Sequence, residues 1–364
     1  MHVLVGCSGG VDSMVSSVLL RRAYCEVSLS HLLMWCYDGE TYDKHVISEE
    51  KEDLCSSYSA SHHVFSLAKA FGMSFHTVDV RDVFFKNIVS TFMDGYCAGI
   101  TPNPCVLCNK DIKFKTLYTQ SLSLGCDHIA TGHYANIGRH EKRYFVKKGV
   151  DSYKDQSYFL WSLPQEYLSK IIFPLGGWHK KDVISYAYNN NLTSLCLKKE
   201  SEDICFLPNC DYRCLLHHYR KEEMTSLQGG DFILGGKVVG KHQGYPFYTI
   251  GQRKGLGLAL GFPVFVQQID PCNNTVFLCR EEKLWADSML VTDINFQKYT
   301  TIEDGLICRV KIRYNSAEKE CAVTWVNDKT VRVIFNKKVR AVTPGQSAVF
   351  YEGDDVIFGG IITK

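Results

Sequence analysis

Two cysteines stand three positions apart in the segment TPNPCVLCNKDIKF (residues 101–114), and this spacing is compatible with several kinds of chemistry. Cys105 and Cys108 could form a disulfide, supply half of a metal site, act as a redox couple, or combine a nucleophile with a neighbouring group. Cys108 comes just before the helical pattern NKDIKFKTLY, so we expect a helix N-terminus to lower the pKa of its thiol. A third cysteine, Cys205 in SEDICFLP, lies where the pattern of strands and helices changes. Transfer of sulfur needs such a set, with one thiolate to carry a persulfide and a second to release the product.

The segment VLVGCSGGVDSMVSS (residues 3–17) predicts a strand, a glycine-rich turn and the start of a helix. Glycines in the turn allow the backbone to come close to a ligand, and the amides of the turn and of the helix N-terminus attract an anion. Ser8 and Ser13 add hydroxyl donors, which a turn used only for packing would not need. The turn lacks the Gly-Lys-Ser/Thr of a Walker A loop. We therefore predict a phosphate-binding loop of another type.

The first half of the chain alternates apolar runs with helical periodicity, which predicts an α/β domain with a parallel sheet. The expected strands are HVLV (2–5), SLSHLLMW (28–35), FHTVDV (75–80) and HIATGH (128–133). After about residue 205 the pattern changes to period-two runs joined by turns, which favours an antiparallel C-terminal β-barrel. Between the two we expect a small α+β middle domain. The predicted boundaries are 1–206, 207–280 and 281–364.

The composition limits the functional classes. A chain of 364 residues, 45% hydrophobic with a net charge of +2, can bury a large core, and its charge neither requires nor excludes nucleic acid. No apolar run reaches the length of a membrane span, and the opening MHVLVGCSGG enters a strand at once, without a signal peptide. We therefore expect a cytoplasmic protein without a membrane partner. In a reducing compartment most of the 16 cysteines are expected to pack as small hydrophobic residues.

The hexapeptide SGGVDS after a first strand resembles the pyrophosphate-loop ATPases, which cleave ATP between the α- and β-phosphates and adenylylate a substrate oxygen. Seven blocks in order then resemble the tRNA 2-thiouridylases, the MnmA/TrmU family that thiolates the wobble uridine. They are GCSGGVDSMVSS, TPNPCVLCNKDIKF, IATGHYA, KDQSYFL, DICF, YTIGQRKGLG and AVTPGQSAVFYEGD. The resemblance implies a pyrophosphate-loop ATPase domain at the N-terminus, ATP with Mg²⁺, a tRNA substrate and a protein that donates persulfide sulfur.

The resemblance also implies roles for individual residues. Cys205 would carry the persulfide, and Cys108 would be the nucleophile that closes a transient Cys108–Cys205 disulfide as sulfur is released. The expected ATP-binding residues are Gly6, Cys7, Ser8, Gly9, Gly10, Val11, Asp12, Ser13, Met34 and Gly132. The residues expected to contact the target base or the tRNA are Asn103, Pro104, Cys105, His133, Lys154, Asp155, Gln156, Arg313, Tyr314 and Gln346.

This chain departs from the family pattern at two places. The family has Asn-Pro-Asp before the nucleophile, whereas this chain has Cys105, so a thiol replaces the carboxylate assigned to acid–base work. The segment after the second strand also differs, and Met34 matches the family position only approximately.

Three alternatives follow from the same residues. Cys105, Cys108 and Cys205 could together hold an iron–sulfur cluster with one open iron. The loop would also suit an ATP-dependent amide ligase of the same superfamily. The third alternative is a non-catalytic RNA-binding or metal-binding protein, which would have no use for an intact SGGVDS loop.

Overall fold

The computed structural model describes residues 1–23, 25–35, 56–196, 204–207 and 211–363. Its N-terminal part contains a five-stranded sheet in the order β3-β2-β1-β4-β7, in which every pairing is parallel. The strands are β1 (His2–Gly6), β2 (Glu26–Leu33), β3 (Ser74–Asp79), β4 (His128–Thr131) and β7 (Ile171–Ile172). β1 and β2 are buried almost throughout, as expected for a parallel sheet covered by helices on both faces. The predicted parallel α/β domain is confirmed.

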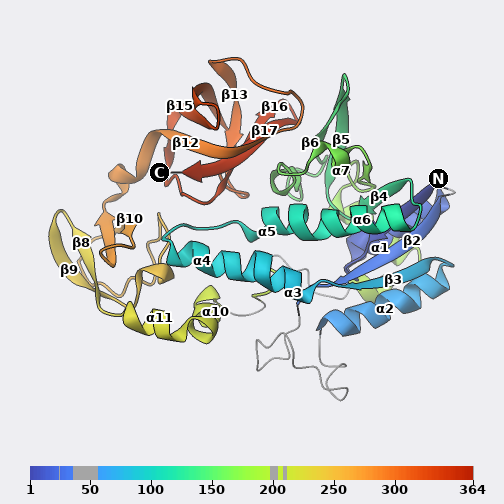
Figure 1. Ribbon diagram of the computed structural model, residues 1–364, viewed down its shortest axis with the longest axis horizontal. Helices are drawn as coiled ribbons and strands as arrows, with labels where there is room; N and C mark the ends of the chain where they lie inside the picture. The colour runs from blue at the N-terminus through green and yellow to red at the C-terminus, as the bar shows by residue number, and fades with distance from the viewer. Residues whose placement is uncertain (24, 36–55, 197–203, 208–210, 364) are drawn as a thin grey trace.

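Two long helical runs link this sheet to the rest of the molecule (Figure 1). The first joins α3 (Arg81–Phe84), η2 (Phe85–Ser90) and α4 (Thr91–Cys97), and the second joins α5 (Pro104–Leu107), η3 (Cys108–Phe114) and α6 (Lys115–Ser123). In both runs the middle segment, η2 or η3, is a π-helix. The two runs contact each other through these segments. π-Helical turns inside α-helices are rare and are frequent at functional sites.

Shorter helices complete the N-terminal part. They are α1 (Val11–Arg22), α2 (Ser56–Ala70), η4 (Ser157–Phe159), α7 (Gln165–Leu168), α8 (Lys180–Tyr188) and α9 (Thr193–Cys196). In α1 the side chains of Val11, Met14, Val15 and Val18 are buried in one hydrophobic cluster, and Leu19 is partly buried against it. No helix among the described residues is long and apolar enough to cross a membrane.

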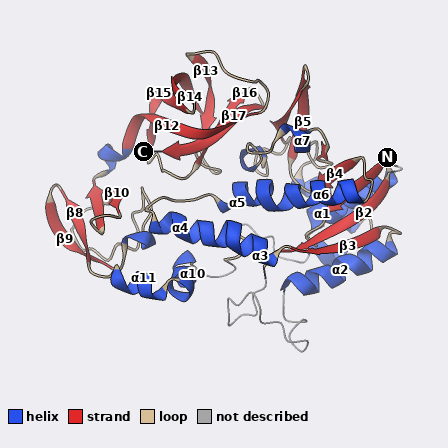
Figure 2. Cartoon of the chain, viewed as in Figure 1, coloured by secondary structure: helices blue, strands red, loops and turns tan. Residues whose placement is uncertain are grey.

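The middle part is a small α+β unit, as predicted. It contains α10 (Tyr212–Tyr219), α11 (Lys221–Ser226), η5 (Tyr245–Phe247) and a four-stranded sheet in the order β10-β11-β8-β9. These strands are β8 (Gly230–Leu234), β9 (Lys237–His242), β10 (Phe265–Asp270) and β11 (Thr275–Cys279). In Figure 2 this sheet stands apart from the other two strand groups, with α4, α5 and α6 running between them.

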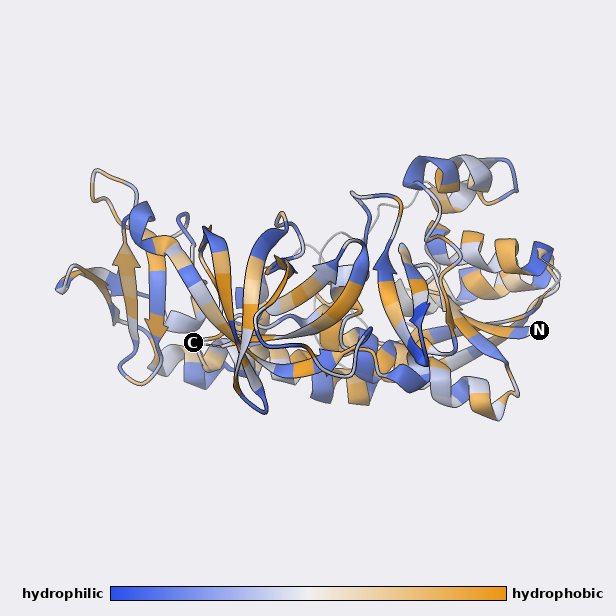
Figure 3. Cartoon of the chain, turned by 90° about the horizontal axis from the view of Figure 1, so that it is seen from above, coloured by the Kyte–Doolittle hydropathy of each residue, from blue (hydrophilic) through white to orange (hydrophobic). Residues whose placement is uncertain are grey.

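The C-terminal part is a closed antiparallel barrel that begins after η6 (Glu281–Leu284). Its strands pair in the order β12-β15-β14-β13-β16-β17, and β17 returns to β12. They are β12 (Trp285–Phe296), β13 (Leu306–Lys311), β14 (Lys319–Asn327), β15 (Thr330–Arg340), β16 (Ser347–Glu352) and β17 (Asp355–Thr363). Closure leaves no free edge in the ring. Hydropathy alternates along several of these strands (Figure 3), which explains why the period-two pattern predicted the barrel correctly.

A hairpin from the N-terminal part, β5 (Ala135–His140) and β6 (Arg143–Lys148), joins the edge of the barrel. Lys147 of β6 pairs with Asp355 of β17. The fully buried Gln297 side chain accepts from the Val146 amide (2.9 Å) and donates to the carbonyls of Leu160 (2.8 Å) and Trp161 (2.9 Å). One carboxamide thus satisfies three backbone groups of the N-terminal part. The sequence pattern gave no sign of this junction.

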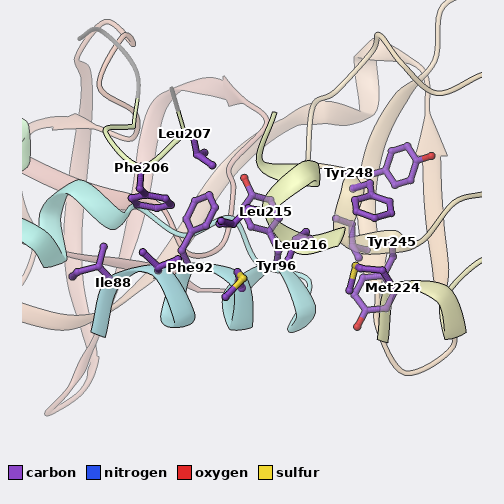
Figure 4. Packing of buried hydrophobic residues seen from close by; sticks show 14 of the residues in the cluster. Ile88, Phe92, Tyr96, Phe206, Leu207, Leu215, Leu216, Met224, Tyr245 and Tyr248 are labelled. Atoms are coloured by element: carbon purple, nitrogen blue, oxygen red, sulfur yellow. The ribbon is translucent and has the colours of Figure 1, made fainter. Parts of the chain in front are cut away.

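A large hydrophobic cluster joins the first helical run to the middle part (Figure 4). Phe206 is 1% exposed and makes edge-on contacts with Phe84 and Phe92, with ring centroids 5.9 and 5.3 Å away. Leu207 is buried in the same cluster, near Leu215 and Leu216 of α10. Because Cys205 directly precedes Phe206, this packing fixes the place of its thiol relative to the helices.

We expect Gln297→Ala to lower the free energy of unfolding by about 1–3 kcal/mol, since it leaves buried backbone groups of the hairpin junction without partners. Urea unfolding should show a lower midpoint for Gln297→Ala than for the wild type. Gln268→Ala, at an exposed position of β10, is the matched control and should leave the midpoint unchanged. Equal midpoints for both variants would show that the carboxamide is not what holds the hairpin to the barrel.

Candidate active site

The strand order of the parallel sheet reverses between β1 and β4. After β1 the chain proceeds to β2 and β3 on one side, and it returns to the other side of β1 for β4. In open parallel sheets, ligands bind where the strand order reverses in this way. The glycine-rich loop follows β1, and Gly132 with His133 follows β4. The predicted phosphate loop therefore lies at the expected position in the sheet.

The backbone of the loop is open toward a ligand. Gly9 has a φ of 80°, a conformation that favours glycine. Gly10 precedes α1, and no side chain caps the first amides of the helix. Gly132 packs directly on this helix start, because a Cβ at Gly132 would lie 2.7 Å from the amide nitrogen of Ser13. The first-turn amides of α1 are thus available for an anion.

The two loop serines differ in their surroundings. Ser8 is exposed, whereas the buried Ser13 hydroxyl donates to the Gly10 carbonyl at 3.0 Å and lies 3.4 Å from the Cys7 sulfur. Cys7 is buried in the core, and its amide donates to the Ser30 carbonyl at 2.8 Å. Ser8 is therefore the freer hydroxyl donor, and Ser13 and Cys7 maintain the shape of the loop.

Asp12 forms an ion pair that the sequence did not predict. Its carboxylate accepts from the Lys180 ammonium at 2.7 and 2.8 Å and from the Tyr134 hydroxyl at 2.7 Å. Lys180 begins α8, and its side chain is only 13% exposed. A cation is therefore held beside the first turn of α1, where a polyphosphate would bind.

Met34 follows the last residue of β2 and packs, partly buried, against the large hydrophobic cluster. The next residue, Trp35, is 7% exposed and stacks on Phe85 at 6.1 Å. The described segment ends at Trp35, so the rest of this departure from the family pattern lies outside the described residues. The predicted contact between Met34 and adenosine remains a prediction.

The helix that carries Cys108 begins earlier than the sequence pattern indicated. Asn103 is its N-cap residue and Pro104 occupies its first turn, so Cys108 lies one turn inside. The expected lowering of the Cys108 pKa by a helix N-terminus is therefore wrong. Burial instead raises the pKa of this thiol, which is 5% exposed. The helix dipole is strongest within the first turn, and Cys105 occupies that turn.

Three thiols and one lysine interact electrostatically in this region. Cys105, Cys108 and Cys205 are all free, and each senses the positive charge of Lys113. The Cys205 thiol has exposed surface, yet desolvation by the surrounding protein raises its pKa to about 12. Among the described residues, no group of three Cys, His, Asp or Glu side chains is placed to hold a metal ion. The three thiols therefore do not form a preassembled site for an iron–sulfur cluster.

His133 directly follows Gly132 and interacts electrostatically with Lys113. Its Nδ1 is 2.7 Å from the Thr131 hydroxyl, and its ring packs against Phe114 (5.7 Å) and Phe173 (6.0 Å). Desolvation, with a smaller contribution from Lys113, lowers the pKa of His133 to about 3. The imidazole is thus neutral at neutral pH and can contact RNA only as a neutral hydrogen-bonding group.

The segment Lys154–Gln156 is a tight turn at the edge of the site. Asp155 is 6% exposed, and its carboxylate accepts from the amides of Gly149 (3.0 Å) and Ser157 (3.1 Å) and from the Ser157 hydroxyl (2.9 Å). Asp155 therefore shapes the turn and does not present its carboxylate to a ligand. Gln156 is tied through both backbone and side chain to Tyr134, the residue that also contacts Asp12.

The barrel brings its predicted residues to the same region. Tyr314 packs on Phe159 at 4.5 Å. The Gln346 amide donates to the Thr101 carbonyl at 2.9 Å. Arg313 donates at 2.6 Å to the Ala341 carbonyl and at 2.6 Å to the Thr343 hydroxyl. Through Tyr158, whose hydroxyl interacts with Asn103 and donates to the Ser347 carbonyl, the barrel also reaches the start of the cysteine helix.

A cleft of about 410 Å³ opens where the three parts of the chain meet. It is lined by Thr101, Thr249, Ile250, Gly251, Gln252, Arg313, Thr343 and Gln346. Two predicted RNA contacts, Arg313 and Gln346, therefore line one cleft together with the glycine-rich loop of the middle part.

Sequence reasoning missed Lys180, Tyr134 and Lys113. Lys180 stands 168 positions after Asp12, and nothing in its local pattern distinguishes it from surface lysines. Lys113 lies in a quoted motif, but its relation to Cys108 depends on a π-helical turn that periodicity does not reveal. The roles of these three residues become visible only in the tertiary structure.

Comparison with known proteins gives matches over nearly the whole chain. Family models match residues 1–209 (tRNA methyl transferase HUP domain), 220–280 (tRNA methyl transferase PRC-barrel domain) and 286–362 (aminomethyltransferase beta-barrel domain). The tRNA-specific 2-thiouridylase MnmA of Cytophaga hutchinsonii is 42% identical over 99% of this chain and 97% of its own length. The enzyme of the same name from Carboxydothermus hydrogenoformans is 40% identical, over 100% of this chain and 97% of its own length.

Among solved structures, a complex of 4-thiouridine synthetase with RNA and bound ATP matches 61% of this chain and 50% of its own. Its sequence identity to this chain is 14%, and the TM-score is 0.35.

The low pKa of His133 predicts a stability that depends on pH. The unfolded histidine titrates near 6.5, and the folded one near 3, so between these values the unfolded chain binds a proton that the folded chain does not. The stability held by neutral His133 is thus complete above about pH 6.5 and is lost as the pH falls toward 3. Between about pH 7.5 and pH 5, protonation of this histidine in the unfolded chain lowers the free energy of unfolding by roughly 2 kcal/mol. His133→Phe should abolish this part of the acid destabilisation.

Urea midpoints at the two pH values measure this difference, and the values near pH 7.5 serve as the reference for each protein. The same acid sensitivity in the wild type and in His133→Phe would mean that this imidazole is not held neutral by the fold.

Proposed function

This chain belongs to the family of tRNA-specific 2-thiouridylases, and from that premise we propose that it uses ATP to replace the 2-oxygen of the wobble uridine with sulfur carried by Cys205. It is a tRNA-uridine 2-sulfurtransferase. One observation carries the proposed mechanism: the phosphate loop and the thiols meet at residues 132 and 133. Gly132 packs on the start of α1, and His133 interacts with Lys113, which interacts with all three cysteines.

The first proposed step is adenylylation of the base. The 2-oxygen of uracil is a poor leaving group, and its attack on the α-phosphate of ATP would release pyrophosphate and turn it into part of AMP. The amides of residues 9–13 support this proposal, because they can bind the phosphates at the uncapped end of α1. Lys180, which is paired with Asp12, can stabilise the negative charge of the departing pyrophosphate.

Mg²⁺ is proposed as the partner of the triphosphate. Magnesium in such sites is held by substrate phosphates with one or two carboxylates. Asp12 is the carboxylate of the loop. In this proposal its carboxylate would bind Mg²⁺ and Lys180 at the same time. The metal would neutralise phosphate charge, and the orientation of Asp12 depends on Tyr134.

The target uracil must leave its stack to reach this site. We propose that it enters beside Asn103, Pro104 and Cys105, at the start of the cysteine helix. Thr101 and Pro102, just before them, accept hydrogen bonds from Gln346 of the barrel. The wall of such a base pocket is therefore braced from two parts of the chain.

The second proposed step transfers sulfur. The terminal sulfur of a persulfide on Cys205, deprotonated, attacks carbon 2, and AMP leaves with the former 2-oxygen. The Cys108 thiolate then attacks the sulfur of Cys205, and the bond between Cys205 and the transferred sulfur breaks. The electron pair goes to the thiouridine, while Cys108 and Cys205 are oxidised to a disulfide. An external dithiol reduces this disulfide, and a donor protein supplies the next persulfide.

Cys105 takes the position where the family has a carboxylate. We propose that it serves as the proton-transfer group beside the base. Burial raises the pKa of its thiol, so the group is protonated at neutral pH and suits the role of an acid.

Contacts with tRNA outside the base are proposed for Lys154, Gln156, Arg313, Tyr314 and Gln346. Arg313 and Gln346 line the three-part cleft, and Lys154 lies close to Tyr314. In this assignment His133 contributes as a neutral group and Asp155 only shapes its turn.

Cys205→Ser and Cys108→Ser should each abolish 2-thiouridine formation, because a hydroxyl neither carries a persulfide nor closes a disulfide. ATP-dependent adenylylation of tRNA should persist in Cys205→Ser, since the phosphate loop is intact. The measurement is mass spectrometry of wobble nucleosides after incubation of protein, ATP, a sulfide source and unmodified tRNA.

Cys272→Ser, at an exposed cysteine of the middle part, is the matched control and should behave as the wild type. Thiouridine at the wild-type yield from either site variant would refute the sulfur relay. Loss of tRNA-dependent pyrophosphate release in Cys205→Ser would refute the separation of the two steps.

A further inference from the structure

The π-helix η3 brings Cys108 and Lys113 to one face of the helix. Its hydrogen bonds join residues five positions apart, so residues 108 and 113 lie approximately above each other. In an ordinary α-helix, with about 3.6 residues per turn, the same two side chains would point about 140° apart. The rare turn therefore has a specific effect: it places a lysine beside a buried cysteine.

Lys113 interacts electrostatically with three cysteines. Desolvation opposes its charge, but Cys108, Cys205 and Cys105 together outweigh this effect, and the pKa of Lys113 is raised. Among the described residues, Asp111 adds negative charge near Cys108, and His133, which also interacts with Lys113, is neutral. Within the same part of the chain, Lys113 is a cation that acts on all three thiols.

Sulfur transfer requires anionic sulfur, and burial opposes it. Desolvation raises the pKa of Cys105, Cys108 and Cys205, and Lys113 is the opposing influence in each case. A nearby opposite charge at short range lowers a pKa by about 1–3 units, an effect strengthened where water is excluded. Without a nearby cation, desolvation would keep these three cysteines as protonated, unreactive thiols.

We propose that Lys113 is the counter-ion of the sulfur relay, and that its ammonium group stabilises the anionic sulfur of Cys108 and of the Cys205 persulfide. The thiol proton leaves to solvent and Lys113 keeps its own, so no proton is exchanged between them. The role of Lys113 in sulfur transfer rests on the proposed function. Its effect on the reactivity of the cysteines can be tested without ATP or tRNA.

The test is alkylation of the full-length protein by iodoacetamide across about pH 6 to 10, with Cys108 and Cys205 followed by peptide mass spectrometry. Lys113→Met removes the charge and keeps an unbranched side chain. Its alkylation profile at Cys108 should move to higher pH by one unit or more, which slows the reaction at least about tenfold near pH 8. Lys113→Arg should restore most of the rate, because it returns the charge.

Lys115→Met is the matched control, because Lys115 is an exposed lysine two positions further along the same helical run. Its profile should equal that of the wild type. A folded Lys113→Met with the wild-type profile would overturn the proposal, and so would a failure of Lys113→Arg to recover any rate. Absence of thiouridine from the wild type would instead contradict the proposed function and leave this result standing.

A second measurement needs no variant. In the wild type the anionic reagent iodoacetate should react faster relative to neutral iodoacetamide at Cys205 than at Cys272, which is exposed. Added salt should reduce this preference, since it screens the attraction of Lys113. A ratio at Cys205 no higher than at Cys272 would contradict the proposal even if Lys113→Met does not fold.

Discussion

The docking of the C-terminal barrel on the backbone of residues 101–103 is the constraint on which the rest of the site depends. The Thr101 amide donates to the Pro344 carbonyl at 3.0 Å, and Gln346 returns a hydrogen bond to Thr101. Gly345 has a φ of 90°, and a Cβ there would lie 2.8 Å from the Thr101 carbonyl oxygen. Only glycine combines this backbone with so close an approach. The contact fixes where the helix at Pro104 begins, and thereby the positions of Cys105, Cys108 and Lys113.

The same contact explains why the chain needs three parts. The N-terminal sheet alone can present phosphate-binding amides, but the wall beside the cysteine helix is held by the barrel. The thiol of Cys205 is positioned by Phe206 in the cluster shared with the middle part. The cleft between all three parts is lined mostly by residues that can donate or accept hydrogen bonds, whereas desolvation at the thiols disfavours negative charge. In the proposed mechanism, RNA binding and sulfur chemistry therefore use different surroundings, and Lys113 supplies positive charge for the sulfur chemistry.

The sequence was sufficient for the features that repeat or that follow local rules. Alternating strands and helices predicted the parallel sheet, and period-two runs predicted the barrel, because burial on one face imposes those periods. The glycines after β1 predicted the loop, since a backbone near an anion needs them. What failed was set by tertiary contacts. Cys108 was expected at a helix start, but Asn103 and Pro104 begin the helix earlier, and the π-helical register that pairs Cys108 with Lys113 has no signature in composition. The Asp12–Lys180 pair and the Gln297 junction join residues more than a hundred positions apart, which periodicity does not sense.

The central claim is that ATP activates the uridine 2-oxygen, which leaves as part of AMP while sulfur takes its place. The most direct measurement uses tRNA whose wobble uridine carries ¹⁸O at position 2, incubated with the protein, ATP and a sulfide source. The account predicts that the heavy oxygen appears in the phosphate of AMP, in an amount equal to the 2-thiouridine formed. Thiouridine formed with the label in water or pyrophosphate, and with unlabelled AMP, would contradict it.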